Sequence, residues 1–168
     1  MKNRKIIIGS RGSKLAIIYA KRAKTELAKF YNEKYIELKN IVTTGDTVQN
    51  IRLSDYGGKG LFSKKIEEEL LDKKIDIAVH ALKDMPSNET EGLLTNCFLK
   101  RNDPREVLIS KNNKKIKDLK PGSIVGTSSF RREFQLKKIR EDLNYKLIRG
   151  NIDTRIKKLN DNLYDAII

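Results

Sequence analysis

Two hydrophobic patterns alternate along this chain. Short apolar runs rich in β-branched residues favour strands, whereas longer stretches with an apolar residue at every third or fourth position favour amphipathic helices. Their alternation predicts an α/β fold, in which helices cover the faces of parallel or mixed sheets. The predicted strands are residues 5–8, 35–42, 75–79, 93–99, 106–110, 123–125, 145–148 and 164–168. The predicted helices are residues 13–30, 61–71, 129–139 and 152–159.

The pattern also suggests where the chain divides. Asp103-Pro104 lies in a charged stretch at 100–105, which is the best candidate for a domain crossing. We therefore expect a first α/β domain at 1–100 and a second at 101–168. The chain ends inside the apolar run 164–168, so we expect further sequence downstream and a truncated second domain.

Residues 43–60 form an unusually long connection that carries four glycines. Long glycine-rich loops in compact domains often act as lids over a site. A plain surface loop fits the same composition, so both interpretations stay open.

Three predicted strands end in short turns that carry arginine and lead into a predicted helix. The turns are residues 9–13 (GSRGS), 126–132 (GTSSFRR) and 149–155 (RGNIDTR). A helix N-terminus attracts anions through its free N–H groups and its dipole, and arginine offers two parallel N–H donors to a carboxylate or phosphate. If the turns converge, they would bind a molecule with several acidic groups.

The composition of the chain bears on the kind of ligand that it could bind. The net charge of +14 would suit nucleic acid, an anionic surface or acidic small molecules. However, 25 of the 36 basic residues are lysines spread along the chain, whereas five arginines cluster in the turns, namely Arg11, Arg131, Arg132, Arg149 and Arg155. We interpret the lysines mainly as a solvated surface and the arginines as the residues directed at a ligand. The hydrophobic content of 38% is enough for a real core.

Candidate catalytic residues follow the predicted strand 75–79. Ligands of α/β sheets bind at the carboxyl ends of strands, which would bring Lys83 and Asp84 to a substrate. Asp84 could bind an N–H group, stabilise a cation or move a proton. A local surface pair of Lys83 with Asp84 is the competing interpretation. His80 is expected to be packed and hydrogen-bonded, and Cys97 to be a buried small hydrophobic residue.

The aspartates Asp46, Asp55, Asp76, Asp103 and Asp165 show no obvious chemical partner in the sequence and are taken as structural. One histidine and one cysteine cannot supply a metal cluster or an internal disulfide. The apolar run near the N-terminus is too short for the core of a signal peptide. No apolar run in the sequence approaches membrane-spanning length. These features predict a cytoplasmic protein without a metal or membrane partner.

The chain resembles hydroxymethylbilane synthases, also called porphobilinogen deaminases, over nearly its whole length. The matching motifs are 9–16 (GSRGSKLA), 43–46 (TTGD), 57–62 (GGKGLF), 76–86 (DIAVHALKDMP), 101–105 (RNDPR), 122–129 (GSIVGTSS), 131–132 (RR) and 149–152 (RGNI). They occur in the family's order. Ala81 replaces the serine that is usual in the family.

This resemblance implies two lobes like those of periplasmic binding proteins. It also implies the catalytic activity of the family. The enzyme condenses porphobilinogen head to tail, with loss of ammonia, into the linear tetrapyrrole hydroxymethylbilane of haem biosynthesis. Asp84 would be catalytic, binding pyrrole N–H groups and stabilising the cationic azafulvene. Lys59 and Phe62 would belong to the lid and the wall of the site. The residues implied to bind substrate and cofactor carboxylates are Arg11, Ser13, Lys83, Thr127, Ser128, Ser129, Arg131, Arg132, Arg149, Gly150 and Arg155.

The family also carries a dipyrromethane cofactor on a cysteine of a third domain. Cys97 does not match that cysteine, so the attachment residue and the third domain are expected to be absent from these 168 residues. The chain alone is therefore expected to be inactive, and the resemblance implies a monomer when full length.

Three alternatives remain open. A truncated remnant would keep the family's site without its activity. A solute-binding module for a polycarboxylate would share the two-lobed architecture. A nucleic-acid binder would use the charge of +14, although aromatic residues make up only 7% of the chain and no recognition motif is visible.

Overall fold

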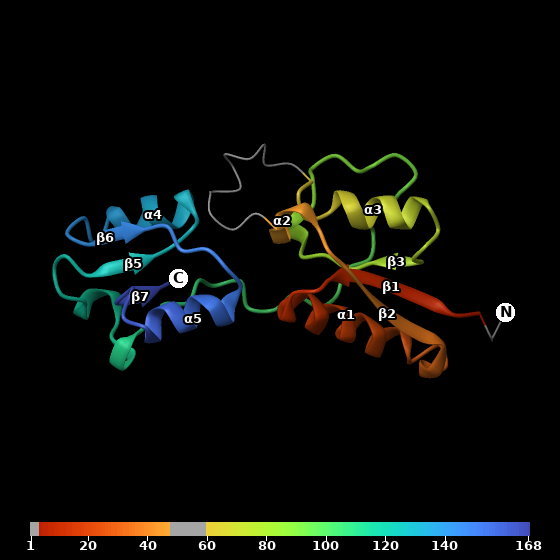
Figure 1. Cartoon of the computed structure of the whole chain (residues 1–168), viewed down its shortest axis with the longest axis horizontal. Helices are drawn as coiled ribbons and strands as arrows, with labels where there is room; N and C mark the ends of the chain where they lie inside the picture. Colours follow the sequence, from red (N-terminus) through yellow and green to blue (C-terminus); the bar gives the residue numbers. More distant parts are fainter. Residues whose placement is uncertain (1–3, 48–59) are drawn as a thin grey trace. The chain divides into compact units, whose positions relative to one another are not determined.

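Each half of the chain builds its own sheet in the computed structural model, which describes residues 4–47 and 60–168 (Figure 1). The two compact units are Met1–Lys100 and Arg101–Ile168. The class is α/β, as predicted, with a parallel sheet in the first unit and a mixed sheet in the second.

The first unit has three parallel strands in the order β2-β1-β3. Their bounds are β1 Ile6–Arg11, β2 Ile36–Ile41 and β3 Ile77–Ala78. The helices are α1 Lys14–Leu27, α2 Thr44–Thr47 and α3 Lys64–Leu71, with 3₁₀ turns η1 Glu33–Tyr35 and η3 Leu82–Asp84.

Alternation along β1 explains why helices cover both faces of this sheet. Successive strand residues point to opposite faces. Ile8 packs with Ala20 of α1, whereas its neighbour Ile7 packs against the cluster that contains Ile66 of α3. Ile8 and Ile66 are fully buried.

The second unit has four strands in the order β4-β7-β5-β6, with β4 antiparallel to β7 and the other pairs parallel. The strands are β4 Ile109–Ser110, β5 Ile124–Gly126, β6 Asn144–Lys146 and β7 Ala166–Ile167. The helices are α4 Phe130–Lys137 and α5 Ile152–Asn160, with 3₁₀ turns η4 Lys111–Asn113 and η5 Ile116–Asp118.

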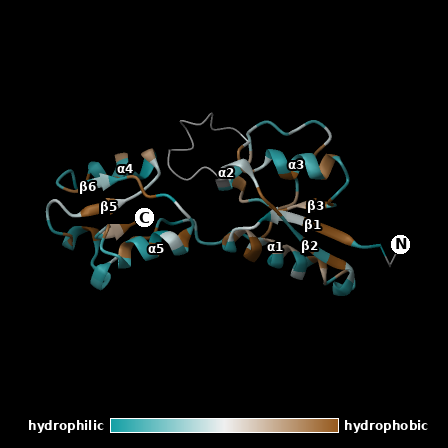
Figure 2. Cartoon of the chain, in the orientation of Figure 1, coloured by the Kyte–Doolittle hydropathy of each residue, from teal (hydrophilic) through white to brown (hydrophobic). Residues whose placement is uncertain are grey.

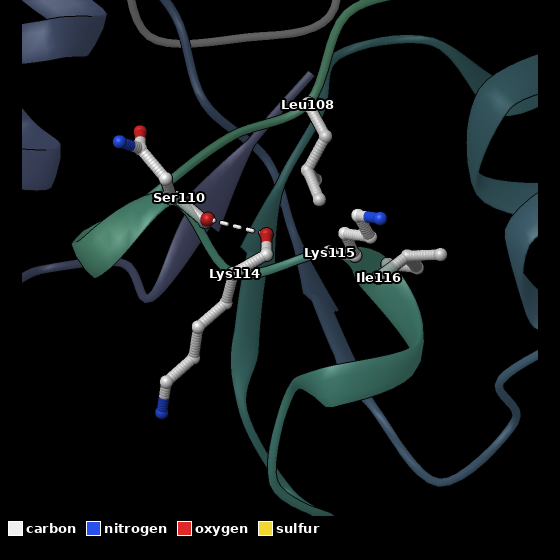
Figure 3. Close-up of a pocket in the computed structure, with 6 residues that line it drawn as sticks. Leu108, Ser110, Lys114, Lys115 and Ile116 are labelled. Atoms are coloured by element: carbon white, nitrogen blue, oxygen red, sulfur yellow. Dashed lines mark hydrogen bonds between the residues drawn. The ribbon is translucent and has the colours of Figure 1, made fainter.

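Two hydrophobic clusters hold this second sheet. Val125 of β5 packs with Leu119, Leu143 and Ala166, and Ile167 of β7 packs on the α5 side. Figure 2 shows β1 and β5 among the hydrophobic segments, which agrees with their place in the two cores. No helix in residues 4–47 and 60–168 is long and apolar enough to cross a membrane.

Two expectations for residues 93–99 are wrong. The segment is not a strand, because its N–H groups are used in local bonds: Leu93 donates to the Thr90 carbonyl at 3.0 Å and Thr95 to the Glu89 carboxylate at 2.7 Å. Cys97 is exposed rather than buried, since this segment does not pair with a strand of the sheet.

The predicted loop 43–60 is only partly described. It begins with the short helix α2, and residues 48–59, which include Lys59 and Asp55, lie outside the described part of the chain.

Candidate functional site

The turn after β1 places Arg11 between two carboxylates and an aromatic ring. Its Nε lies 3.1 Å and its Nη2 2.5 Å from Oδ1 of Asp46, and its Nη1 lies 3.8 Å from Oδ2 of Asp84. Its guanidinium carbon lies 3.9 Å from the centre of the Phe62 ring. A guanidinium fixed by hydrogen bonds on one side and by a ring on another has little freedom to move. Arg11 is therefore held in place before any ligand arrives.

Asp46 is the partner of Arg11 that sequence reasoning missed. It also accepts hydrogen bonds from the Thr43 N–H at 3.2 Å and the Thr43 hydroxyl at 2.7 Å. Burial would raise the pKa of Asp46, but the hydrogen bonds from Arg11 and Thr43 outweigh burial and lower the pKa. The signal was available, because Asp46 closes the matched motif 43–46.

Gly45 explains how Phe62 reaches this cluster. A Cβ at position 45 would lie 2.2 Å from the Phe62 ring, so only glycine leaves room for it. The Gly45 N–H donates to the Leu61 carbonyl at 2.8 Å, which ties α2 to the segment that carries Phe62.

Asp84 lies in η3, which follows β3. Its N–H donates to the Ala81 carbonyl at 2.9 Å and thereby closes the turn. Its side chain is 24% exposed, so the carboxylate stays open to a ligand. Lys83, the other predicted residue of this turn, is exposed.

His80 is packed behind Asp84. Burial lowers the pKa of His80, while Glu67 and Asp84 raise the pKa and Arg11 lowers it further. Its Nε2 is buried and has no hydrogen-bond partner in the described part of the chain. The expected packing is present, and the buried Nε2 does not contribute to the expected hydrogen bonding.

The hydroxyls at the two helix starts have structural partners. Ser13 caps α1, its Oγ accepting from the Ala16 N–H at 3.3 Å. Ser129 caps α4, its Oγ accepting from the Arg132 N–H at 3.4 Å. Ser/Thr side chains at this position satisfy N–H groups that the helix leaves unpaired.

Hydrogen bonds between side chains and the backbone also hold the turn between β5 and α4. The Thr127 Oγ1 accepts from the Ser129 N–H at 3.2 Å, and the Ser128 hydroxyl donates to the Ile148 carbonyl. Thr127 is 1% exposed. These three predicted residues shape the turn, and Ser128 links it to the segment that precedes Arg149.

Arg131 and Arg132, in the first turn of α4, share one carboxylate. Glu106 pairs through Oε1 with Nη2 of Arg131 and through Oε2 with Nη2 of Arg132, the latter at 2.6 Å. Arg132 also donates from Nη1 to the Ile168 carbonyl at 3.1 Å. Hydrogen bonds from Arg131 and then Arg132 lower the pKa of Glu106.

Arg155, on α5, completes a cationic cluster in the second unit. Its Nε donates to the Gly150 carbonyl at 2.9 Å. Burial lowers the pKa of Arg155, and the charges of Arg149 and Arg132 lower it further. Arg149 and Arg155 belong to the third predicted turn and Arg132 to the second, so positive charge from two turns acts on Arg155.

The predicted residues thus form two constellations, one in each unit. Arg11, Asp84 and Phe62 meet in the first, together with Asp46. In the second, Arg131 and Arg132 share the carboxylate of Glu106, and the charges of Arg149 and Arg132 lower the pKa of Arg155. The first combines a carboxylate with a fixed cation, which suits an N–H group or a developing positive charge, and the second suits carboxylates.

Known proteins are similar to this chain in sequence. The family model described as "Porphobilinogen deaminase, dipyromethane cofactor binding domain" matches residues 6–168. A porphobilinogen deaminase of Bacillus mycoides (strain KBAB4) is 53% identical over 165 residues, which are 98% of this chain and 53% of that relative. A porphobilinogen deaminase of Geobacillus kaustophilus (strain HTA426) is 52% identical over 165 residues, which are again 98% of this chain and 53% of that relative. The chain spans about half the length of the curated relatives it matches.

Proposed function

Because the chain belongs to the porphobilinogen deaminase family, we propose that it forms part of a hydroxymethylbilane synthase. This transferase joins porphobilinogen units into a linear tetrapyrrole in haem biosynthesis. The two units would be the first two domains of that enzyme, residues 1–100 and 101–168. The single observation that carries the proposal is the placement of Asp84 beside the fixed guanidinium of Arg11, with Nη1 and Oδ2 3.8 Å apart.

We assign Asp84 the central chemical role. When porphobilinogen loses ammonia, its aminomethyl carbon becomes part of a cationic azafulvene. A carboxylate that faces the pyrrole N–H stabilises that cation by charge and by a hydrogen bond. Arg11, whose Nη1 lies 3.8 Å from Oδ2 of Asp84, would place a fixed positive charge beside that carboxylate while the substrate binds.

The arginines would bind the acidic side chains. Each pyrrole carries an acetate and a propionate, so negative charge accumulates as the product grows. A hydrogen bond between a guanidinium and a carboxylate contributes roughly 1.5–3 kcal/mol. Arg131, Arg132, Arg149 and Arg155 supply such bonds from the second unit, and Lys83 adds a cation in the first. Lys59, outside the described residues, is proposed as a lid residue.

The dipyrromethane cofactor fits this chemistry. Arginines of the second unit already bind one carboxylate, that of Glu106 on Arg131 and Arg132, and a two-pyrrole group carries four. When bound, the cofactor supplies the pyrrole carbon to which the first substrate is joined. Arg132, Arg149 and Arg155 of the second unit would hold its acids. Cys97 is not proposed as its attachment site.

The proposal also covers the cellular location and the oligomeric state of the enzyme. A single cysteine suits a reducing compartment, so we place the enzyme in the cytoplasm. We propose a full-length monomer that acts on small pyrroles rather than nucleic acid.

Intact-mass spectrometry tests this function. The protein is isolated in the longest form that its source makes, incubated with porphobilinogen and weighed. We expect a covalent two-pyrrole group and a ladder of added pyrrole units. A protein without any adduct, which binds polycarboxylates tightly but leaves porphobilinogen unchanged, would instead be a solute-binding module and would contradict the proposal.

A further inference from the structure

Glu106 occupies the two arginines that the proposed function assigns to substrate carboxylates. It lies in the segment before β4 and belongs to the same unit as α4. Its carboxylate spans both guanidinium groups, with one oxygen on Arg131 and the other on Arg132. This is the arrangement by which a pair of arginines binds an external carboxylate.

We propose that Glu106 is an internal counter-ion that substrate carboxylates must displace, and that it thereby selects ligands with several acidic groups. A ligand with one acid gains little from replacing one carboxylate by another. A ligand with several acids gains bonds to neighbouring arginines as well, and that gain drives the exchange. Glu106 is therefore a specificity-determining residue.

The exposure of the ion pairs favours displacement. The side chains of Glu106 and Arg131 are 38% and 59% exposed. Ion pairs that water reaches are weak, so the exchange costs little. A similar carboxylate sealed in the interior would block the arginines permanently.

The arginines keep other contacts when Glu106 leaves. Arg132 donates to the Ile168 carbonyl at 3.1 Å, and Arg131 lies 3.4 Å from the Gln135 Oε1 within α4. Arg132 also lies in the first turn of α4, where its N–H donates to the Oγ of the Ser129 cap. Removing the charge of Glu106 therefore frees the guanidinium groups without releasing the residues that carry them.

This inference rests on the proposed function only in taking Arg131 and Arg132 as ligand-binding, and simple acids can test it without the reaction. Succinate and acetate are titrated into the 168-residue chain, its Glu106→Gln variant and a Glu141→Gln control. Glu141 is an exposed glutamate of the same unit, so the control loses the same charge elsewhere. Binding is followed by the NMR signals of the arginine side chains.

We expect Glu106→Gln to bind succinate about three- to tenfold more tightly than the unmodified chain, as loss of one or two exposed ion pairs implies. Its preference for succinate over acetate should fall, because acetate then finds both arginines open. Glu141→Gln should bind as the unmodified chain does. Equal or weaker succinate binding by Glu106→Gln would overturn the inference.

Two further readouts keep the test decisive. If Glu106→Gln does not fold, succinate must still shift the carboxyl carbon signal of Glu106 in the unmodified chain, and an unmoved signal overturns the inference. Porphobilinogen is titrated in parallel. Succinate binding that follows the expected order, with no response to porphobilinogen in any variant, would contradict the proposed function and leave the role of Glu106 standing.

Discussion

At the scale of single residues, Arg11 shows how a cation is prepared for a ligand. Asp46 binds one side of its guanidinium, Phe62 stacks on it, and Asp84 faces the remaining edge. Asp46 thus acts through Arg11 rather than on a ligand. This positioning role depends on the carboxylate staying charged.

Replacing Asp46 by asparagine tests that role. Asp46→Asn should lower the free energy of unfolding at pH 7 by about 1–3 kcal/mol, because charged hydrogen bonds to Arg11 are lost. Urea unfolding measures the change. Asp103→Asn, which breaks an exposed pair with Arg105, is the control and should leave stability unchanged.

The pH dependence of Asp46 has a defined sign. Its pKa in the folded chain lies below the ordinary value of an aspartate, about 3.9, so its contribution to stability is complete above that pH and is lost as the pH falls through the folded-state pKa. The acid-induced loss of stability below about pH 4 should therefore be shallower in Asp46→Asn. An identical acid limb in both proteins would contradict the assignment.

His80 gives a second pH effect, in a separate range. Its pKa in the fold lies below 6.5 because of burial, so the unfolded chain takes up a proton first as the pH falls. Stability is complete above pH 6.5 and should decline below it by up to about 1.4 kcal/mol per pH unit.

His80→Gln should remove this decline, which unfolding curves between pH 7 and pH 5 would show. His80 is the only histidine in the chain, so no other imidazole can mask the result. A decline of the same slope in His80→Gln would refute the buried neutral imidazole.

At the scale of elements, the turns between strands and helices carry the site. Gly150 is the second residue of the third arginine turn and has a φ of +107°, where side chains are strained. A Cβ at this position would lie 2.8 Å from the Cβ of Thr154. Its carbonyl also accepts from Arg155. The shape of this turn therefore sets the position of an arginine.

Gly150→Ala should destabilise the chain by about 1–3 kcal/mol. Gly12→Ala is the matched control, since a Cβ at position 12 meets nothing within 4 Å, and its effect should stay within about 0.5 kcal/mol. Thermal unfolding compares them. Equal stabilities of the two variants would show that the turn tolerates a side chain at Gly150.

The sequence predicted the positions of helices and strands better than the contacts that they make with distant parts of the chain. The helix expected at 13–30 is α1, Lys14–Leu27, because its apolar spacing is local information. The strand expected at 93–99 is not formed, because a strand needs a neighbour that no local pattern can specify. Asp46 was missed for the same reason: its partner Arg11 lies 35 residues away.

At the scale of the whole molecule, the net charge of +14 divides into two kinds of cation. Lysines such as Lys65 and Lys157 pair with acids along exposed helix faces. Arg131 and Arg132, in contrast, share the carboxylate of Glu106 in the first turn of α4. Arginines that bind a carboxylate in this way suit the acidic side chains of the proposed substrate.

The most direct test is the rate of hydroxymethylbilane formation from porphobilinogen by the longest form of the protein that its source makes, with and without Asp84→Ala. Asp103→Asn serves as the control for loss of a carboxylate. We predict turnover by the unmodified protein and the control, and a loss of at least about 100-fold in the folded Asp84→Ala variant. No turnover by the unmodified protein, or near-normal turnover by Asp84→Ala, would contradict the account.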